Sequence, residues 1–170
     1  MAASERHVRE TQFNDGIAQV ERLAGVPLLK ATFAYGGELR LHFGEPVEYG
    51  SAKLKGRTRG SWVLGLRATP WALTKAGVLL SRSFDEPEHV LRHFNEREGA
   101  QLTDARVRRT DLALTLRFAD DAWFMALTEP RRRRVAELWE LLTPDGSFVV
   151  GWANRSITTE PADAGLRQLP

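Results

Sequence analysis

The fold of this chain is decided by a stretch that occurs twice. Residues 62–77 read WVLGLRATPWALTKAG, and they return with an insertion as WFMALTEP at 123–130 and WELLTPDG at 139–146. The matched residues are Trp62 with Trp123, Pro70 with Pro130, Trp71 with Trp139, and Gly77 with Gly146. Tryptophans, prolines and turn glycines that recur in one order predict duplication of a unit of about 70 residues.

Segments upstream of both stretches match in the same order. Residues 39–43 (LRLHF) correspond to 114–118 (LTLRF). Further matches are Phe13, Gly25, Leu28, Ala31 and Phe33 with Phe84, Gly99, Leu102, Ala105 and Val107. We therefore divide the chain into an N-terminal segment (1–12), copy one (13–83), copy two (84–152) and a flexible tail (153–170), which is short of large apolar residues.

Hydrophobic periodicity and turn signals predict the same elements in each copy. Apolar residues at helical spacing indicate helices at 14–24 and 85–99. Alternating apolar residues and Gly36-Gly37 indicate a hairpin over 28–43. Further strands are expected at 62–67, 71–73, 78–80, 102–109, 112–118, 122–128, 137–142 and 147–152. The expected fold class is α+β, with two tandem pseudo-symmetric copies, each a helix against a mostly antiparallel meander sheet.

Composition excludes several classes of chemistry. Apolar residues make up 42% of the chain, charged residues 27%, and the net charge is only +2. Because there is no cysteine, disulfides, thiol nucleophiles and thiolate metal sites are excluded. Residues 1–9 are polar and carry no signal-peptide pattern, so we expect a cytoplasmic protein that does not span a membrane.

Three candidate sites have simpler explanations. His89 and His93 have metal-ligand spacing with Glu96, but all three fall opposite the apolar stripe of their helix, on a solvated face. Residues 50–58 resemble a phosphate-binding loop, yet the glycine spacing is wrong and a strand follows where a helix must begin. Asp120-Asp121 lies between two strands, where aspartate commonly stabilises a turn. We therefore predict no catalytic residues, no metal and no cofactor.

The basic insertions are the candidate partner-binding residues. They are insertions relative to the other copy, and segments not needed by the shared fold are free to carry function. The four repeat-matched tryptophans are expected in the core, whereas Trp152 has no clear match and is the candidate exposed aromatic. The predicted partner-binding residues are Lys53, Lys55, Arg57, Arg59, Arg131, Arg132, Arg133, Arg134 and Trp152.

One half of the chain carries a familiar pattern. Residues 111–120 read Asp-Leu-x-Leu-x-Leu-x-Phe-x-Asp, and Trp139-Glu140-Leu141 and Pro144-Asp145-Gly146 follow. This pattern resembles small uncharacterised bacterial domains that share the strand and the Trp-Glu and Asp-Gly motifs. The turn glycine of those domains is replaced by Asp121. The resemblance implies structural motifs only, so it assigns no activity and no functional residue.

These observations favour a non-enzymatic, cytoplasmic protein-interaction module, of an immunity or accessory type. It would bind another protein through the basic loops and a groove between the copies. The alternative is a nucleic-acid-binding protein that uses its arginine clusters. An enzyme of unknown class is the third hypothesis, and the oligomeric state stays open.

Overall fold

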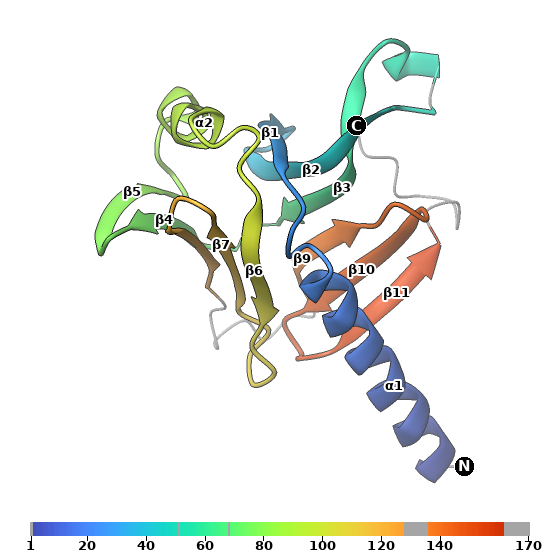
Figure 1. Cartoon of the computed structure of the whole chain (residues 1–170). Helices are drawn as coiled ribbons and strands as arrows, with labels where there is room; N and C mark the ends of the chain where they lie inside the picture. The colour runs from blue at the N-terminus through green and yellow to red at the C-terminus, as the bar shows by residue number, and fades with distance from the viewer. Residues whose placement is uncertain (1, 51, 68, 128–135, 162–170) are drawn as a thin grey trace.

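The computed structural model describes residues 2–50, 52–67, 69–127 and 136–161 (Figure 1). The elements of this part of the chain are α1 (Ala2–Glu21), β1 (Leu28–Ala34), β2 (Glu38–Glu48), the 3-10 helix η1 (Ala52–Leu54), β3 (Thr58–Leu66), β4 (Trp71–Lys75), β5 (Val78–Arg82), α2 (Pro87–Asn95), β6 (Leu102–Val107), β7 (Leu114–Phe118), β8 (Ala122–Ala126), β9 (Glu137–Leu142), β10 (Ser147–Trp152) and β11 (Ile157–Pro161). Helices and mostly antiparallel strands place the chain in the α+β class.

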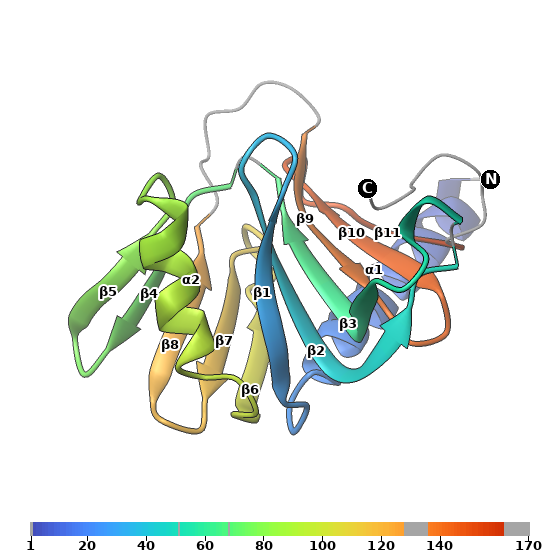
Figure 2. The same ribbon diagram turned by 90° about the horizontal axis from the view of Figure 1, so that it is seen from above.

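The strands form two sheets, and each sheet takes strands from both halves of the chain (Figure 2). One sheet has the order β1-β2-β3-β9-β10-β11, and the other has the order β5-β4-β8-β7-β6. This corrects the prediction that each copy forms a sheet of its own. After β3 the chain crosses within residues 67–70 to the second sheet, so β3 pairs with β9 instead of β4.

The two sheets repeat one plan. Three strands of one half, β1-β2-β3 or β6-β7-β8, are continued by two strands of the other half, β9-β10 or β4-β5. Each first pair of strands also has a register shift at the same place. Leu28 pairs with Phe43 and Lys30 with His42, just as Leu102 pairs with Phe118 and Asp104 with Arg117.

The halves meet at an isolated antiparallel bridge between Pro27 and Gln101. Backbone hydrogen bonds around the bridge come in reciprocal pairs. Gly25 N donates to Leu102 O and Gly99 N to Leu28 O, both at 2.7 Å, while Leu28 N donates to Ala100 O and Leu102 N to Val26 O. Exchanging residues 25–28 with 99–102 converts each bond into its counterpart, which is the pattern of a local twofold axis.

Three of the four repeat-matched tryptophans are buried. Trp71 and Trp139 occupy equivalent positions, since Trp71 pairs with Ala126 of β8 and Trp139 with Leu66 of β3. The match of Trp62 with Trp123 is wrong by one residue. Leu39 and Leu114 are equivalent, and their strand partners are Leu66 and Ala126, so the residue equivalent to Trp62 is Ala122. Trp123 therefore points to the opposite side of its strand. It is only half-buried, and the Arg117 guanidinium lies 5.2 Å from its ring centroid.

The core lies between the inner faces of the two sheets and the helices. Its largest fully buried side chains are Trp139, Phe43, Phe94, Phe118 and Phe124. α1 packs on β6, β10 and β11, and α2 packs on β1 and β5, so each helix closes one side of the space between the sheets (Figures 1 and 2).

Three segments differ from the sequence prediction. α1 begins at Ala2 instead of residue 14, because residues 2–13 are rich in good helix formers, although Phe13 is the only partly buried side chain among residues 5–13. The basic loop is shorter than expected, since β2 and β3 extend into it as a two-stranded arm. Part of the predicted tail forms β11, whose buried Ile157 packs directly against Gly16 of α1.

Candidate functional site

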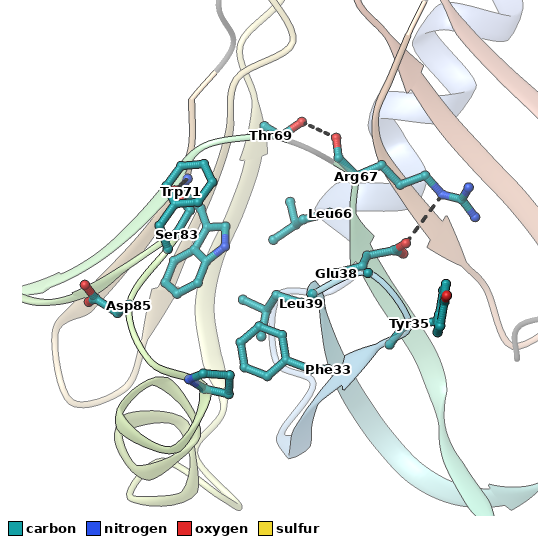
Figure 3. Close-up of a pocket in the computed structure, with 15 residues that line it drawn as sticks. Phe33, Tyr35, Glu38, Leu39, Leu66, Arg67, Thr69, Trp71, Ser83 and Asp85 are labelled. Atoms are coloured by element: carbon teal, nitrogen blue, oxygen red, sulfur yellow. Dashed lines mark hydrogen bonds and ion pairs between the residues drawn. The ribbon is translucent and has the colours of Figure 1, made fainter.

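A groove opens where the two sheets separate, at one end of the molecule (Figure 3). It encloses about 680 Å³ between the β1–β2 turn, the β3–β4 link and the loop that precedes α2. We call it the inter-sheet groove, and its lining residues are Phe33, Ala34, Tyr35, Gly36, Gly37, Glu38, Leu39, Leu66, Arg67, Thr69, Trp71, Ser83, Phe84, Asp85 and Pro87. Its volume is within the range of natural ligand pockets.

The floor of the groove is apolar and rigid. Leu39, Leu66 and Trp71 are nearly inaccessible to solvent. The Trp71 ring lies 5.7 Å from the Phe124 ring and 6.2 Å from the Phe94 ring, measured between centroids. Because this aromatic cluster belongs to the core, the floor holds its shape without a bound partner.

Two aromatic side chains stand at the rim without protein neighbours to cover them. Tyr35 is 97% exposed and Phe84 is 98% exposed. The Phe13–Phe84 match of the two copies therefore fails in the structure, because Phe13 lies in α1 and packs on the core while Phe84 lies in a loop. Exposed aromatic rings beside a preformed apolar floor are typical of a binding surface.

The loop that carries Phe84 is fixed by its neighbours. Phe84 has φ +76°, a left-handed conformation that is uncommon for a bulky residue. Asp85 Oδ2 accepts hydrogen bonds from Arg82 N at 2.9 Å and from Ser81 Oγ at 3.3 Å. Ser83 N donates to Trp71 O at 2.9 Å. These bonds hold the backbone on both sides of Phe84, so the ring is displayed at a defined place.

A cluster of charges forms the polar end of the groove. Arg67 Nε lies 3.7 Å from Glu38 Oε2 and 3.3 Å from Glu137 Oε2, and Arg67 Nη2 lies 3.7 Å from Glu140 Oε1. Burial raises the pKa of the Glu140 carboxyl, an effect that Arg67 opposes. The cluster ties β2, β3 and β9 together beside the cavity.

The sequence analysis missed this charge cluster and both rim aromatics. Glu140 offered one signal, because it lies between two core residues of β9 and so must occupy the outer face of the sheet. Tyr35 and Phe84 offered none, since both are loop residues and their exposure depends on segments that are far away in the sequence.

The predicted basic residues of copy one lie on the arm between β2 and β3. Lys53, Lys55 and Arg57 are exposed, and Arg59 is half-buried, with Nη1 donating to Gly60 O at 2.9 Å. None of these four residues lines the groove, but Arg57 lines a second pocket that shares Phe33 and Ala34 with it. The arm and the groove are therefore neighbouring surfaces, with the cations on the arm and the apolar floor in the groove.

The other predicted partner-binding residues have different surroundings. Arg131, Arg132, Arg133 and Arg134 lie outside the described residues. The chain enters and leaves that segment beside the groove, because Leu127 N donates to Pro70 O at 2.7 Å and Glu137 pairs with Arg67. Trp152 is half-buried, packs on a small apolar cluster of the outer sheet face, and donates its Nε1 hydrogen to Thr158 Oγ1 at 2.9 Å.

The rejected histidine and aspartate sites can also be located. His89 and His93 have ring centroids 4.8 Å apart, but His89 Nε2 lies 3.0 Å from Leu80 O and its Nδ1 lies 2.9 Å from Arg92 Nη2. Asp120 and Asp121 form the turn between β7 and β8. Among the described residues, no group of three or more His, Asp or Glu side chains is arranged to hold a metal ion.

Comparison of the chain with models of known protein families, with curated proteins and with solved structures found no match. In the part of the chain that the structure describes, none of the helices has the length and apolar character needed to cross a membrane.

Proposed function

We propose that this chain is a non-enzymatic, cytoplasmic interaction module that binds another protein in the inter-sheet groove. The observation that carries the proposal is the pair of almost fully exposed aromatic rings, Tyr35 and Phe84, above an apolar floor. The partner supplies an extended segment with a large apolar side chain, which enters the cavity between the two rings and contacts Trp71.

The neighbouring edge strand β5 is less suited to binding a partner than the groove is. β5 is an edge strand with exposed Val78 and Leu79, and such edges can bind an extended peptide through their backbone. Here two outward backbone groups are already engaged, since Arg82 N donates to Asp85 and Leu80 O accepts from His89. The groove is therefore the better-prepared surface.

A peptide selection tests this function directly. Peptides selected from a random display library on the wild-type protein are measured again on Phe84→Ala and Tyr35→Ala. We expect each variant to weaken binding by about 30-fold, the effect of losing about 2 kcal/mol at an interface hot spot. Leu79→Ala is the matched control, because Leu79 is an exposed apolar residue that does not line the groove. Peptides that bind all four proteins equally would contradict the proposal.

We also propose that the two halves arose by duplication and exchanged their last strands. Support comes from the equal strand order, the equal register shifts and the reciprocal hydrogen bonds around Pro27 and Gln101. Such an exchange gives each sheet a seam, β3–β9 or β4–β8, at which strands of both halves meet. The groove opens at the end of one seam, where Leu66 pairs with Trp139.

Nucleic-acid binding is the second candidate, and the exposed cations of the arm favour it. Lys53, Lys55 and Arg57 are solvent-accessible within five residues of one another. If they contact phosphates, changing all three to serine flattens the slope of log affinity against log salt by about 0.7 per lost contact with single strands. An unchanged slope for a bound oligonucleotide would remove the arm from this function.

A further inference from the structure

A second pocket lies on the outer face of the six-stranded sheet, beneath the arm. It encloses about 360 Å³. Its floor is made by the side chains of β1 and β2 that point away from the core, among them Lys30, Thr32, Arg40 and His42. Its wall is made by the arm, and Lys30 Nζ joins the two by donating to Thr58 O at 2.6 Å.

The pocket is strongly basic. Lys30, Arg40 and Arg57 line it, and no aspartate or glutamate is found among its described lining residues. Two carboxylates interact with Arg40: Glu38 Oε1 lies 3.6 Å from its Nε, and the Arg40 charge opposes the rise in the pKa of Glu140. Three cations therefore face one small cavity, and Glu38 and Glu140 offset part of the charge of Arg40. A small anion would relieve the repulsion among these cations.

A hydrogen bond from His42 orients the hydroxyl of Thr32, which lines the same cavity. Gly60 N donates to His42 Nδ1 at 3.2 Å, so the ring hydrogen must be on Nε2. Nε2 then donates to Thr32 Oγ1 at 3.0 Å, which leaves the Thr32 hydroxyl hydrogen for a ligand. Burial, followed by the charges of Lys30, Arg40 and Arg59, lowers the pKa of His42 to about 4, so the ring stays neutral at physiological pH.

We propose that this pocket binds the phosphate group of a small phosphorylated molecule. Lys30, Arg40 and Arg57 neutralise the phosphate charge, and Thr32 donates a hydrogen bond to one of its oxygens. The cavity is larger than a bare phosphate, and Tyr49 and Leu54 supply apolar surface for the remainder of the molecule. The site borders the inter-sheet groove at Phe33 and Ala34, but Lys30, Thr32, Arg40 and Arg57 do not line that groove, so the site does not depend on the proposed protein partner.

Calorimetric titration of the full-length protein tests the site with three probes: inorganic phosphate, adenosine 5′-monophosphate and a short oligothymidylate. We expect saturable binding of the monophosphate, with phosphate competing for the same site. Arg57→Gln and Thr32→Val should each weaken the binding of the monophosphate by about 10-fold, because each removes one charge-assisted hydrogen bond. Lys55→Gln is the matched control, because Lys55 is an exposed cation of the same arm that does not line the pocket.

Three outcomes would overturn the proposal. The first is absence of saturable binding of both small probes at millimolar concentration. The second is an equal loss in Lys55→Gln and Arg57→Gln, because binding would then follow the general charge of the arm. The third is binding of the oligothymidylate alone, which would identify a nucleic-acid strand as the ligand of the arm. Arg57 is exposed, so its substitution tests the site without a risk to folding.

Discussion

Replacing Phe84 by glycine should leave the protein as stable as the wild type or slightly more stable. Phe84 is 98% exposed, so removal of its ring forfeits almost no buried apolar surface. Its φ of +76° costs a non-glycine residue about 1–2 kcal/mol, which glycine avoids. Against this, glycine adds about 0.5–1 kcal/mol of conformational entropy to the unfolded chain. The net expectation is a gain of between about 0 and 1.5 kcal/mol in the free energy of unfolding.

Chemical denaturation of three variants measures this balance. Phe84→Ala keeps the Cβ and hence the strained backbone, so it should match the wild type, and Phe84→Gly should exceed it. Leu79→Gly is the control at an exposed strand position, where glycine should cost about 1 kcal/mol. A loss of more than about 1 kcal/mol in Phe84→Gly would refute the reasoning, because the ring would then have to pack on the protein. Both Phe84 variants should lose groove binding equally.

Other predictions concern the core, the histidine and the division between the halves. Trp71→Ala should lower the free energy of unfolding by about 3–5 kcal/mol in denaturant melts, since the ring packs on Phe94 and Phe124, and an unchanged midpoint would make it a surface residue. Gly151→Ala should destabilise strongly, because a Cβ there would overlap the Trp139 indole, whereas a similar change at exposed Gly50 should be tolerated. The folded pKa of His42, about 4, lies below the unfolded value near 6.5, so the unfolded chain binds the proton first and stability falls by about 3 kcal/mol as pH drops from 6.5 to 4. His42→Gln should remove this part of the pH dependence, and parallel pH profiles of both proteins would be inconsistent with a buried neutral ring. Fragments 1–83 and 84–170 should each fail to fold alone and should assemble when co-expressed, as judged by gel filtration, because each sheet takes strands from both.

Sequence reasoning located most of the strands because their signals are local. Alternation within 39–43 and 114–118, and turn glycines such as Gly77, depend on neighbouring residues alone. The exchange of strands between the sheets could not be predicted in this way. A β3–β4 pair and a β3–β9 pair bury the same side chains of β3, so the hydrophobic pattern does not distinguish them.

The phosphate pocket could have been predicted, because its floor follows from one hairpin. The sequence analysis placed 28–43 in a hairpin around Gly36-Gly37. Such a hairpin pairs Lys30 with His42 and Thr32 with Arg40 on the face opposite Ala31 and Leu41. The wall of the pocket could not have been predicted from the sequence, since Arg57 lines the pocket only because β2 and β3 continue into the arm.

The two halves differ most where a binding function would be added to a shared fold. In the first half, Arg67 and Thr69 of the link between β3 and β4 line the groove. The corresponding link of the second half, from β8 to β9, spans residues 127–136 and includes the arginine run. At its start Leu127 N donates to Pro70 O, and just after its end Glu137 forms an ion pair with Arg67, at the same end of the molecule as Tyr35 and Phe84. The link that carries the arginine run therefore starts and ends beside the inter-sheet groove, which makes this end of the molecule the surface to test first for a protein partner.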